Sequence, residues 1–339
     1  MFRPVYKINT ILLDNIVKIK NIINELNDQR FSNLVLAEFE KDSYAISAFA
    51  STSIEGNPLP LTEVRKLLKQ KPIHIRDTER EVLNYNKALE HLNSLVNKPK
   101  TIDSEFVCKI QSLVIEGLMD KKNIGKFRKD AVVVNDPKKR QIAYIPPDAK
   151  DVIGLMTELS VYLKKEFNNI DPLILAGIFH KQFVIIHPFM DGNGRTTRLI
   201  TKYLLARMGL DTFKLFSFEN YYNKNITRYF SSVGVLGDYY DIKEKVDFTD
   251  WLIYFTEGII DELLRVQKLL NSTNFVTRIG DHEKVILDYI KKRGSISKGE
   301  YDKITDRARS TQILDFKRMV EKGLINREKQ GKATFYTLN

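Results

Sequence analysis

The spacing of apolar and polar positions predicts a chain that is mostly helical. Apolar residues recur at helical spacing from about residue 8 to residue 97, where the polar run Asn97–Lys100 breaks the pattern. A new helix start follows at Thr101–Asp103, and a second polar break lies at Asn271–Asn274. We therefore expect three regions, with these bounds: an N-terminal helical region at 1–100, a core at 101–272 and a C-terminal domain at 280–339.

The most apolar helix of the core leads directly into a glycine-rich loop. Residues 171–186 form an apolar run that predicts a buried helix, with Asp171 as its N-cap and Pro172 at its first helical position. A second helix is expected from Thr196 to Met208, with Gly209 as its C-cap. The residues between them should form a short turn that ends at a helix N-terminus.

Two short β-branched runs predict a hairpin within this helical chain. Ala131–Val134 is the first run, Asn135–Pro137 is a turn signal and Ile142–Ile145 is the second run. The expected fold is therefore mainly α, with a small β-hairpin at residues 131–147 of the core.

The last sixty residues have a pattern of their own. Three helices are expected, at His282–Arg293, Ser297–Ile304 and Asp306–Lys322. Ser297 is the expected cap of the second helix, and Leu324–Leu338 should form a hairpin with its turn at Lys329–Lys332. Three helices and a hairpin resemble a winged helix-turn-helix domain at residues 280–339.

The composition is that of a globular protein. The 339 residues, 43% hydrophobic and 29% charged, are enough for two or three domains. Cys108 is the one cysteine, so no intrachain disulfide can form, and its helical context predicts a small core residue. The N-terminus lacks a signal-type apolar segment, and no run of about 18 apolar residues occurs. We therefore expect a cytoplasmic protein without a membrane span.

The loop from His187 to Arg198, HPFMDGNGRTTR, combines groups that suit a phosphate ligand. Gly192 and Gly194 have no side chains, so a phosphate could approach the backbone N–H groups at the start of the second helix. Arg195 and Arg198 lie three residues apart, roughly on one side of that helix, and guanidinium groups grip phosphates with forked donors.

Further side chains of this loop add chemistry to the phosphate site. His187 is the natural general base at neutral pH, and Asp191 offers magnesium a carboxylate beside phosphate oxygens and water. Asn193 can cap the helix or donate to a phosphate, and Phe189 reads as a core anchor for the loop. Each element alone is more often structural, but the combination predicts a site that holds a nucleoside triphosphate and deprotonates an attacking hydroxyl.

This segment resembles the signature of the Fic family, H-x-F-x-[D/E]-G-N-G-R-x-x-R, at every fixed position. The resemblance implies an enzyme that uses magnesium and transfers AMP from ATP to a Ser, Thr or Tyr hydroxyl of a protein. It implies that His187 takes the hydroxyl proton, that Asp191 holds magnesium, and that Asn193 and the loop amides bind the α- and β-phosphates. By the same resemblance, Arg195 would help to neutralise these phosphates and Arg198 would reach the γ-phosphate.

The resemblance extends to the hairpin at 131–147, which is similar to the Fic flap that aligns a target chain by strand addition. Four flap residues would border the nucleotide and the target: Gln141, Ile142, Ala143 and Tyr144. Tyr229 is the nearest match to a tyrosine that lies near the adenine in this family, although Leu236–Val246 looks like an insertion. His180 lies seven residues before His187; a metal-binding pair is conceivable, but we favour a buried structural histidine.

The segment Ser51–Asn57, STSIEGN, ends a helix that begins near Asn33. Gly56 is the helix stop, so Glu55 lies where the helix dipole disfavours a carboxylate by roughly 0.3–1 kcal/mol and a cationic partner is expected. The segment resembles the inhibitory pattern of Fic proteins, [S/T]-x-x-x-E-[G/N]. The resemblance implies that Glu55 pairs with Arg198, blocks the γ-phosphate and autoinhibits the enzyme; some relatives also remove AMP with this glutamate.

The formal net charge of +11 keeps nucleic-acid binding in view. Residues 280–339 hold 14 basic and 9 acidic residues, a net charge of +5. The candidate DNA contacts are Arg307, Arg309, Ser310 and Thr311 on the third helix, and Lys329 and Lys332 on the wing. Such domains also dock proteins or form homodimers.

Two functions from different classes therefore stay open. One is a transferase that acts on ATP and a target protein, with self-modification expected, and the other is a DNA-binding regulator whose Fic-like domain senses a nucleotide. The intact His187 and Asp191 favour the transferase, because sensing needs no base. Transfer of another phosphate-linked group is a weaker third reading.

Overall fold

The structure is a computed structural model that describes residues 2–28, 33–70, 72–98, 100–136, 141–206, 216–272, 281–330 and 333–338. Several expected cap and turn residues lie outside the described residues: Pro137, Met208, Gly209, Gly331 and Lys332. The chain divides into two compact units, Met1–Ile23 with Asp42–Leu264 and Asn24–Lys41 with Arg265–Asn339. Within the described residues, no helix has the length and apolar character needed to cross a bilayer.

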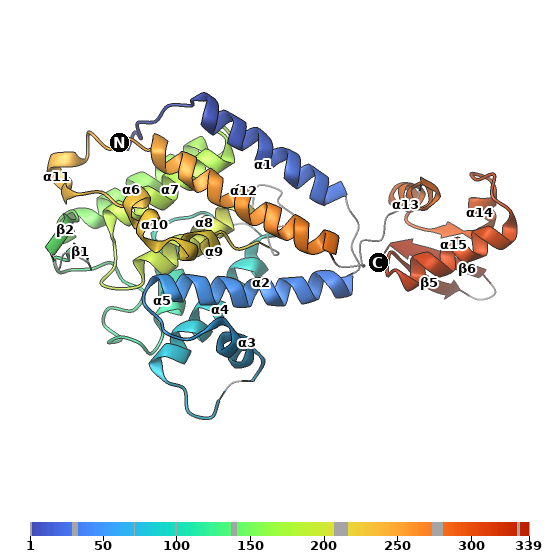
Figure 1. The fold of residues 1–339 in the computed structure, drawn as a ribbon, viewed down its shortest axis with the longest axis horizontal. Coiled ribbons are helices and arrows are strands. Elements are labelled where there is room, and N and C mark those ends of the chain that lie inside the picture. Colours follow the sequence, from blue (N-terminus) through green and yellow to red (C-terminus); the bar gives the residue numbers. More distant parts are fainter. Residues whose placement is uncertain are drawn as a thin grey trace. The chain divides into compact units, whose positions relative to one another are not determined.

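The chain is mainly helical, as predicted (Figure 1). The helices up to residue 272 are α1 (Thr10–Asp28), α2 (Asn33–Ile54), α3 (Leu61–Lys69), α4 (Asp77–Leu95), α5 (Ser104–Val114), α6 (Ala149–Glu166), α7 (Pro172–Ile186), α8 (Asn193–Ala206), α9 (Phe218–Lys224), α10 (Ile226–Val233), α11 (Tyr239–Ile242) and α12 (Thr249–Ser272).

Helix α7 is the centre of the first unit, and most of its residues are buried. Its predicted start is confirmed, because the Asp171 side chain accepts a hydrogen bond from the backbone N–H of Leu173 and Pro172 is the first helical residue. It packs against α8 and α6, and α8 packs in turn against α4 and α5. A Cβ on Gly177 would lie 2.5 Å from Leu252, so this glycine lets α12 approach α7 closely.

The predicted hairpin is present beside the end of α7. Strands β1 (Val134–Asp136) and β2 (Gln141–Ile145) are antiparallel, although β1 begins later than expected. The segment expected to be an insertion supplies β3 (Gly237–Asp238), which pairs in parallel with β2, and α11. The Tyr144 hydroxyl donates to the carbonyl of Ile185 at 2.9 Å, and this bond ties the hairpin to α7.

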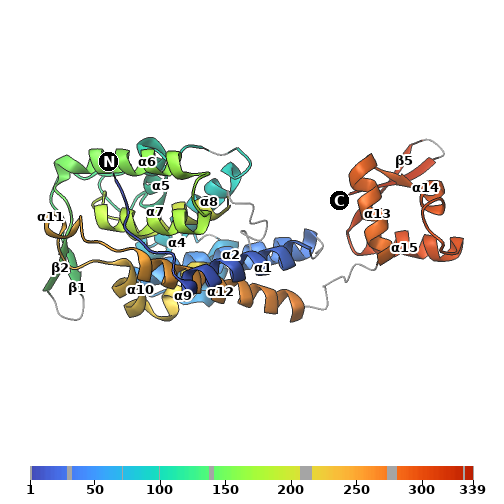
Figure 2. The same ribbon diagram turned by 90° about the horizontal axis from the view of Figure 1, so that it is seen from above.

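The N-terminal helices differ from the expected separate region at 1–100. Helix α1 contacts α12, where the Asn15 amide donates to the Thr256 hydroxyl at 3.0 Å, and both views show the two helices close together (Figure 2). Helix α4 sends the Tyr85 hydroxyl into the core, where it donates to Glu219 at 2.7 Å. These contacts make residues 1–23 and 42–100 part of the same unit as the core. Cys108 on α5 is only partly buried, not a core residue.

Residues 281–338, called the C-terminal unit below, are part of the second of the two units. They have the predicted order of helices and strands. The elements of residues 281–338 are α13 (Asp281–Arg293), β4 (Ile296–Ser297), α14 (Lys298–Asp302), α15 (Arg309–Glu321), β5 (Ile325–Gln330) and β6 (Ala333–Leu338). Strand β6 lies between β4 and β5 in an antiparallel sheet. Ser297 caps α14 as predicted, in a reciprocal capping box with Glu300. Helix α15 begins at Arg309, three residues later than expected.

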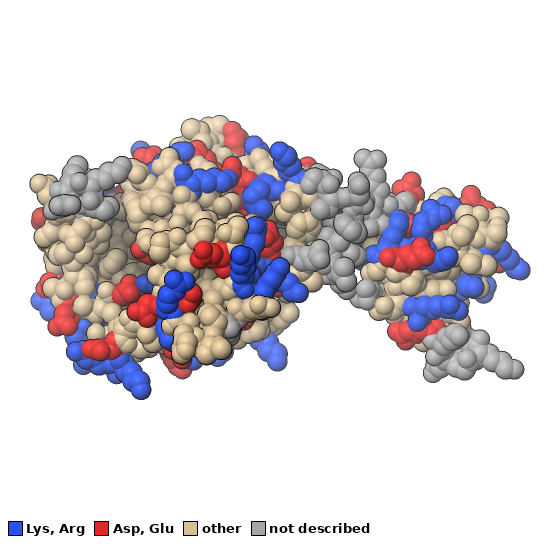
Figure 3. Space-filling model, turned by 60° about the horizontal axis from the view of Figure 1, so that its bottom comes forward, with Lys and Arg blue, Asp and Glu red and all other residues tan. Residues whose placement is uncertain are grey.

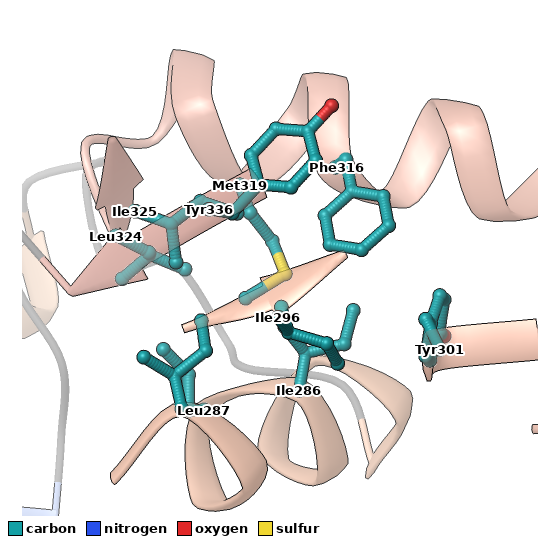
Figure 4. Packing of buried hydrophobic residues seen from close by; sticks show 10 residues of the cluster. Ile286, Leu287, Ile296, Tyr301, Phe316, Met319, Leu324, Ile325 and Tyr336 are labelled. Carbon is teal, nitrogen blue, oxygen red and sulfur yellow. The ribbon is translucent and has the colours of Figure 1, made fainter. Parts of the chain in front are cut away.

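An apolar cluster holds these elements together (Figure 4). Phe316 of α15 stacks on Tyr336 of β6 at a ring distance of 4.1 Å, with Met319 buried beside them. Tyr301 of α14 meets Phe316 edge to face at 5.3 Å. The unit therefore has a small core of its own, separate in sequence from the loop that carries the candidate chemistry.

Candidate active site

The loop between α7 and α8 begins with a strained residue. His187 caps α7 with φ 49° and ψ 60°, a left-handed conformation that no other non-glycine residue adopts in the part of the chain described. Such a conformation costs about 1–3 kcal/mol and persists where surrounding contacts impose it. In this conformation the backbone turns sharply at His187, where the apolar helix α7 ends.

Arg128 supplies many of the contacts that impose this turn. Its Nε donates to the carbonyl of His187 at 2.8 Å, and its backbone N–H donates to the carbonyl of Pro188 at 2.9 Å. Its guanidinium also donates to the carbonyls of Asp130 and Pro147, on either side of the hairpin. Arg128 is buried and was not predicted, because in the sequence it looks like one more basic residue in a charged segment.

The next part of the loop is fixed by Phe189 and Asn193. Phe189 is completely buried, as predicted for a core anchor. Its N–H donates to the Asn193 side-chain oxygen at 2.9 Å, and the Asn193 amide donates to its carbonyl at 2.8 Å. Helix α8 begins at Asn193, three residues earlier than expected. The amide side chain of Asn193 therefore holds the turn, and its predicted phosphate contact stays a prediction.

Gly192 is a position where only glycine fits. Its φ is +81°, and a Cβ there would lie 2.9 Å from Ile115. Beside it, the Gln111 amide donates to the Asp191 carbonyl at 3.1 Å and accepts from the N–H of Gly125 at 2.7 Å. Gln111 of α5 thus holds the loop in place. Nothing in the sequence distinguished this glutamine as a site residue.

The His187 imidazole is suited to accept a proton. Its Nδ1 lies 3.4 Å from the carbonyl of Val184, so a proton on Nδ1 leaves Nε2 with its lone pair. Burial lowers the pKa of His187 below its ordinary value, and the ring is therefore neutral at pH 7. A general base must be neutral before it accepts a proton. His187, which lies before the loop that leads to the N-terminus of α8, meets this requirement.

Asp191 and Arg195 form an ion pair within the loop. Arg195 Nη2 lies 2.9 Å from Asp191 Oδ1, and the other Arg195 terminus contacts Glu81 of α4. Glu81 also accepts from the Asn57 amide at 2.7 Å, which links Arg195 to the STSIEGN segment. Glu81 was not predicted, since a glutamate on an amphipathic helix is common.

The same pair bears on the expected magnesium ion. The Asp191 side chain is 51% exposed, so its carboxylate still faces solvent beside Arg195. One carboxylate together with phosphate oxygens and water is a usual ligand set for magnesium. A magnesium ion would fit this donor set, and Asp191 as its protein ligand stays a prediction.

The predicted pair between Glu55 and Arg198 is confirmed. Arg198 Nη2 donates to Glu55 Oε1 at 2.7 Å; the Arg198 side chain is fully buried and that of Glu55 is 30% exposed. Arg198 also donates to the Ser51 hydroxyl at 2.8 Å and to the Ser51 carbonyl at 2.9 Å. The last turn of α2 and the residue after it therefore satisfy most of the donors on this guanidinium.

The Glu55 carboxylate lies against the first turn of α8. A Cβ on Gly194 would come within 2.2 Å of Glu55 Oε1, so the absence of a side chain at residue 194 makes room for the carboxylate. The N-terminus of a helix favours negative charge, and Arg198 adds a full positive charge there. The N-terminus of α8 is thus suited to an anion, and the carboxylate of Glu55, the residue after α2, lies against it.

The flap and Tyr229 differ in how well they match their expected roles. Gln141 and Ile142 are exposed and Ala143 is partly buried, whereas Tyr144 is buried against α7. Tyr229 is 1% exposed, so its placement does not support the expected adenine contact. Aromatic packing around Tyr229 explains why it is buried.

Aromatic rings from several helices bury both Tyr229 and His180. The Tyr229 ring stacks on Tyr222 at 4.5 Å. His180 is fully buried between Tyr229 and Trp251, so its predicted burial is confirmed. Tyr229 therefore belongs to the core behind the site and not to its solvent-facing wall.

Comparison with known proteins shows which family this chain resembles. Residues 101–205 match the sequence model of the Fic/DOC family. "Protein adenylyltransferase Fic" of Aedes aegypti is 32% identical over 183 residues, which are 52% of this chain and 35% of that protein. The protein of the same name from Culex quinquefasciatus is 31% identical over 217 residues, 58% of this chain and 42% of that protein. The chain thus spans less than half the length of these curated relatives.

A solved structure supports the fold over the whole chain. A Fic family protein from Desulfovibrio desulfuricans G20 superposes with a TM-score of 0.66 and covers 100% of this chain and 98% of its own. The two sequences are 20% identical, a level at which the likeness shows the fold alone.

Proposed function

We propose that this chain, which contains a Fic domain, is a protein adenylyltransferase that transfers AMP from ATP to a hydroxyl group of a target protein. The observation that carries the proposal is one arrangement: a neutral His187 lies at the loop that opens onto the N-terminus of α8, where Asp191, Arg195 and Arg198 gather. The names of the curated relatives support the same reaction.

The reaction follows from the placement of these groups. His187 Nε2 takes the proton of the target hydroxyl while its oxygen attacks the α-phosphorus of ATP. The new P–O bond forms as the bond from the α-phosphorus to the bridging oxygen breaks, and diphosphate leaves. Backbone N–H groups at Gly192 and Gly194, with Arg195, would stabilise the charge on the phosphoryl oxygens. Magnesium, held by Asp191, would neutralise part of the phosphate charge.

We propose further that Glu55 autoinhibits the enzyme. Its carboxylate pairs with Arg198 and lies against Gly194, which is where the γ-phosphate would bind if Arg198 contacts it. Two negative groups cannot share this site without strong repulsion. ATP in a productive position therefore requires Glu55 to leave, and the same carboxylate could orient a water molecule for AMP removal.

The test of both proposals uses ATP labelled at the α- or the γ-phosphate. Purified full-length protein would be incubated with magnesium and cell lysate, as wild type, Glu55→Gly, and Glu55→Gly with His187→Ala. Label transfer from α-labelled ATP only, increased by Glu55→Gly and abolished by His187→Ala, is expected. Glu63→Gly, which removes an exposed carboxylate of α3, is the matched control and should leave labelling at the wild-type level. No α-label in any variant would refute AMP transfer, and equal labelling by wild type and Glu55→Gly would refute the inhibition.

DNA binding and homodimer formation through the C-terminal unit stay predictions. Arg307 lies 3.2 Å from the buried Asp315, and Arg309, although 86% exposed, lies 3.2 Å from Asp302. On the face of this unit seen in Figure 3, acidic side chains lie among the basic ones. The salt dependence of retention on duplex DNA and the solution mass of the full chain would test the two predictions.

A further inference from the structure

A chain of buried hydrogen bonds begins at Arg198 Nη1, whereas Nη2 of the same guanidinium donates to Glu55. The Tyr229 hydroxyl of α10 lies 3.5 Å from Arg198 Nη1 and 3.1 Å from His180 Nε2. On the other side of the imidazole, His180 Nδ1 lies 3.1 Å from the Thr201 hydroxyl. Thr201 donates in turn to the carbonyl of Thr197 at 2.8 Å, one turn earlier on α8.

The direction of each bond in this chain can be assigned. The contact of the Thr201 hydroxyl with the Thr197 carbonyl, at 2.8 Å, is shorter than its contact with His180 Nδ1, at 3.1 Å, so we assign its one proton to the carbonyl and the imidazole proton to Nδ1. His180 Nε2 is then an acceptor, and its partner among the described residues, the Tyr229 hydroxyl, donates to it. The ring is neutral, because burial lowers the pKa of His180 well below its ordinary value.

This assignment leaves the Tyr229 oxygen with lone pairs and no proton to offer Arg198. The oxygen can only accept from Arg198 Nη1, which is the polarity that a guanidinium requires of its partners. The contacts of Arg198 with Ser51 and Glu55 come from the end of α2 and the residue after it, whereas the Tyr229 contact comes from α10. A displacement of the α2 terminus would remove the first group and leave the second.

We propose that Tyr229 and His180 are positioning residues that hold the Arg198 guanidinium ready for the γ-phosphate when Glu55 leaves. The proposal rests on the proposed function, in which Arg198 binds that phosphate. A buried arginine without fixed acceptors would lose its orientation and would repack at a cost. His180 acts through Tyr229, because it accepts the phenol proton and so turns the phenol lone pairs toward Arg198.

The aromatic cluster offers a matched control for this role. Tyr222 stacks on Tyr229 and is equally buried, yet within the described part of the chain its hydroxyl has no hydrogen-bond partner. Tyr222→Phe and Tyr229→Phe each remove one buried hydroxyl from adjacent stacked rings. A difference between them reports the contact with Arg198 and not the packing of the cluster.

The experiment compares ATP with ADP, which lacks the γ-phosphate. Calorimetry would measure the Kd of each nucleotide with magnesium for the full-length Glu55→Gly protein and for the same protein with Tyr229→Phe or Tyr222→Phe. We expect Tyr229→Phe to weaken ATP binding by about 2- to 10-fold, the usual range for one hydrogen bond, and to leave ADP binding unchanged. Tyr222→Phe should change neither. Equal losses for ATP and ADP, or equal effects of the two variants, would overturn the proposal.

Substitutions that remove or replace the Nε2 acceptor test the role of His180. In the Glu55→Gly protein, His180→Leu removes the acceptor and should weaken ATP binding selectively, whereas His180→Gln places an oxygen near the Nε2 position and should restore it. Melting curves would identify a variant that fails to fold, in which case the tyrosine pair decides. If the Glu55→Gly parent binds ATP but transfers no AMP, the proposed reaction fails while the ATP-to-ADP comparison still decides the positioning role. A parent that binds neither nucleotide overturns both.

Discussion

The loop His187–Arg198 and the C-terminal residues 281–338 differ in which side chains they bury. In the loop, Asn193, Arg195 and Arg198 are buried polar groups, each with named partners. The C-terminal residues bury an apolar cluster together with Glu283, Gln312 and Asp315, whereas none of the basic side chains described there is buried. Burial of a positive charge costs free energy unless its partners are in place, so a loop that buries two arginines side by side has a purpose other than stability. An exposed basic residue carries no such information.

The largest expected effect is the loss of the base. Under the proposed function, His187→Ala should lower AMP transfer by about 100- to 10,000-fold, since general-base catalysis contributes that range. Initial rates of α-label transfer in the Glu55→Gly protein would measure it. The melting temperature should change little, because alanine keeps the backbone and the partly buried ring has one long hydrogen-bond contact among the described residues, to the carbonyl of Val184.

His91→Ala is the control for this variant, because His91 is a partly buried histidine of α4 remote in sequence from the loop. It should leave the transfer rate unchanged. A His187→Ala protein that kept more than about a tenth of the activity would show that another group takes the proton.

The second effect concerns the support of the loop. Arg128→Met removes the donors to the carbonyls of His187 and Pro147, and each buried carbonyl left without a partner costs about 1–3 kcal/mol. We expect a lower free energy of unfolding, measured in urea, together with slower AMP transfer. Lys129→Met removes an exposed charge from the next position and should change neither. Loss of stability with a full transfer rate would mean that the loop keeps its shape without Arg128.

The contrast between the two regions also explains what the sequence could predict. The helices α7 and α13 to α15 follow from apolar spacing and from caps such as Asp171 and Ser297, which are local signals. The pair Glu55–Arg198 was predicted because both residues belong to recognisable motifs. Motifs of this kind record which residue types must meet, even when 143 positions separate them.

The residues that the sequence did not reveal act through tertiary contacts alone. Arg128, Gln111 and Glu81 support the loop from three other segments, and nothing in their local patterns distinguishes them from surface residues. Tyr229 was expected at the adenine because its position after α8 matched a family pattern. Tyr229 is buried because rings from α7, α9 and α12 pack around it, and that information is not local.

The third prediction concerns pH. Burial lowers the pKa of His187, so its neutral form persists below pH 6.5, and a base must be neutral to act. AMP transfer by the Glu55→Gly protein should therefore stay constant from pH 8 to about pH 6.5 and fall only at lower pH, as the folded pKa is passed. Between that folded pKa and about 6.5 the unfolded state binds more protons at this site, so stability also declines as pH falls. A rate that already fell at pH 7 would contradict a desolvated base.

The smallest expected effect lies in the C-terminal unit. Ser297→Ala removes the cap of α14, which accepts from the Glu300 N–H at 3.3 Å, and should cost about 1 kcal/mol. Hydrogen exchange of α14 and α15 amides would then be about 5-fold less protected, because 1.4 kcal/mol corresponds to a factor of ten. Ser310→Ala, an exposed serine in the first turn of α15, should not reduce protection. Because the cap lies in the unit without the candidate chemistry, AMP transfer by the Glu55→Gly protein should not change with Ser297→Ala. A change in transfer would mean that the C-terminal unit takes part in the reaction, and the contrast between the two regions would then be one of fold and not of function.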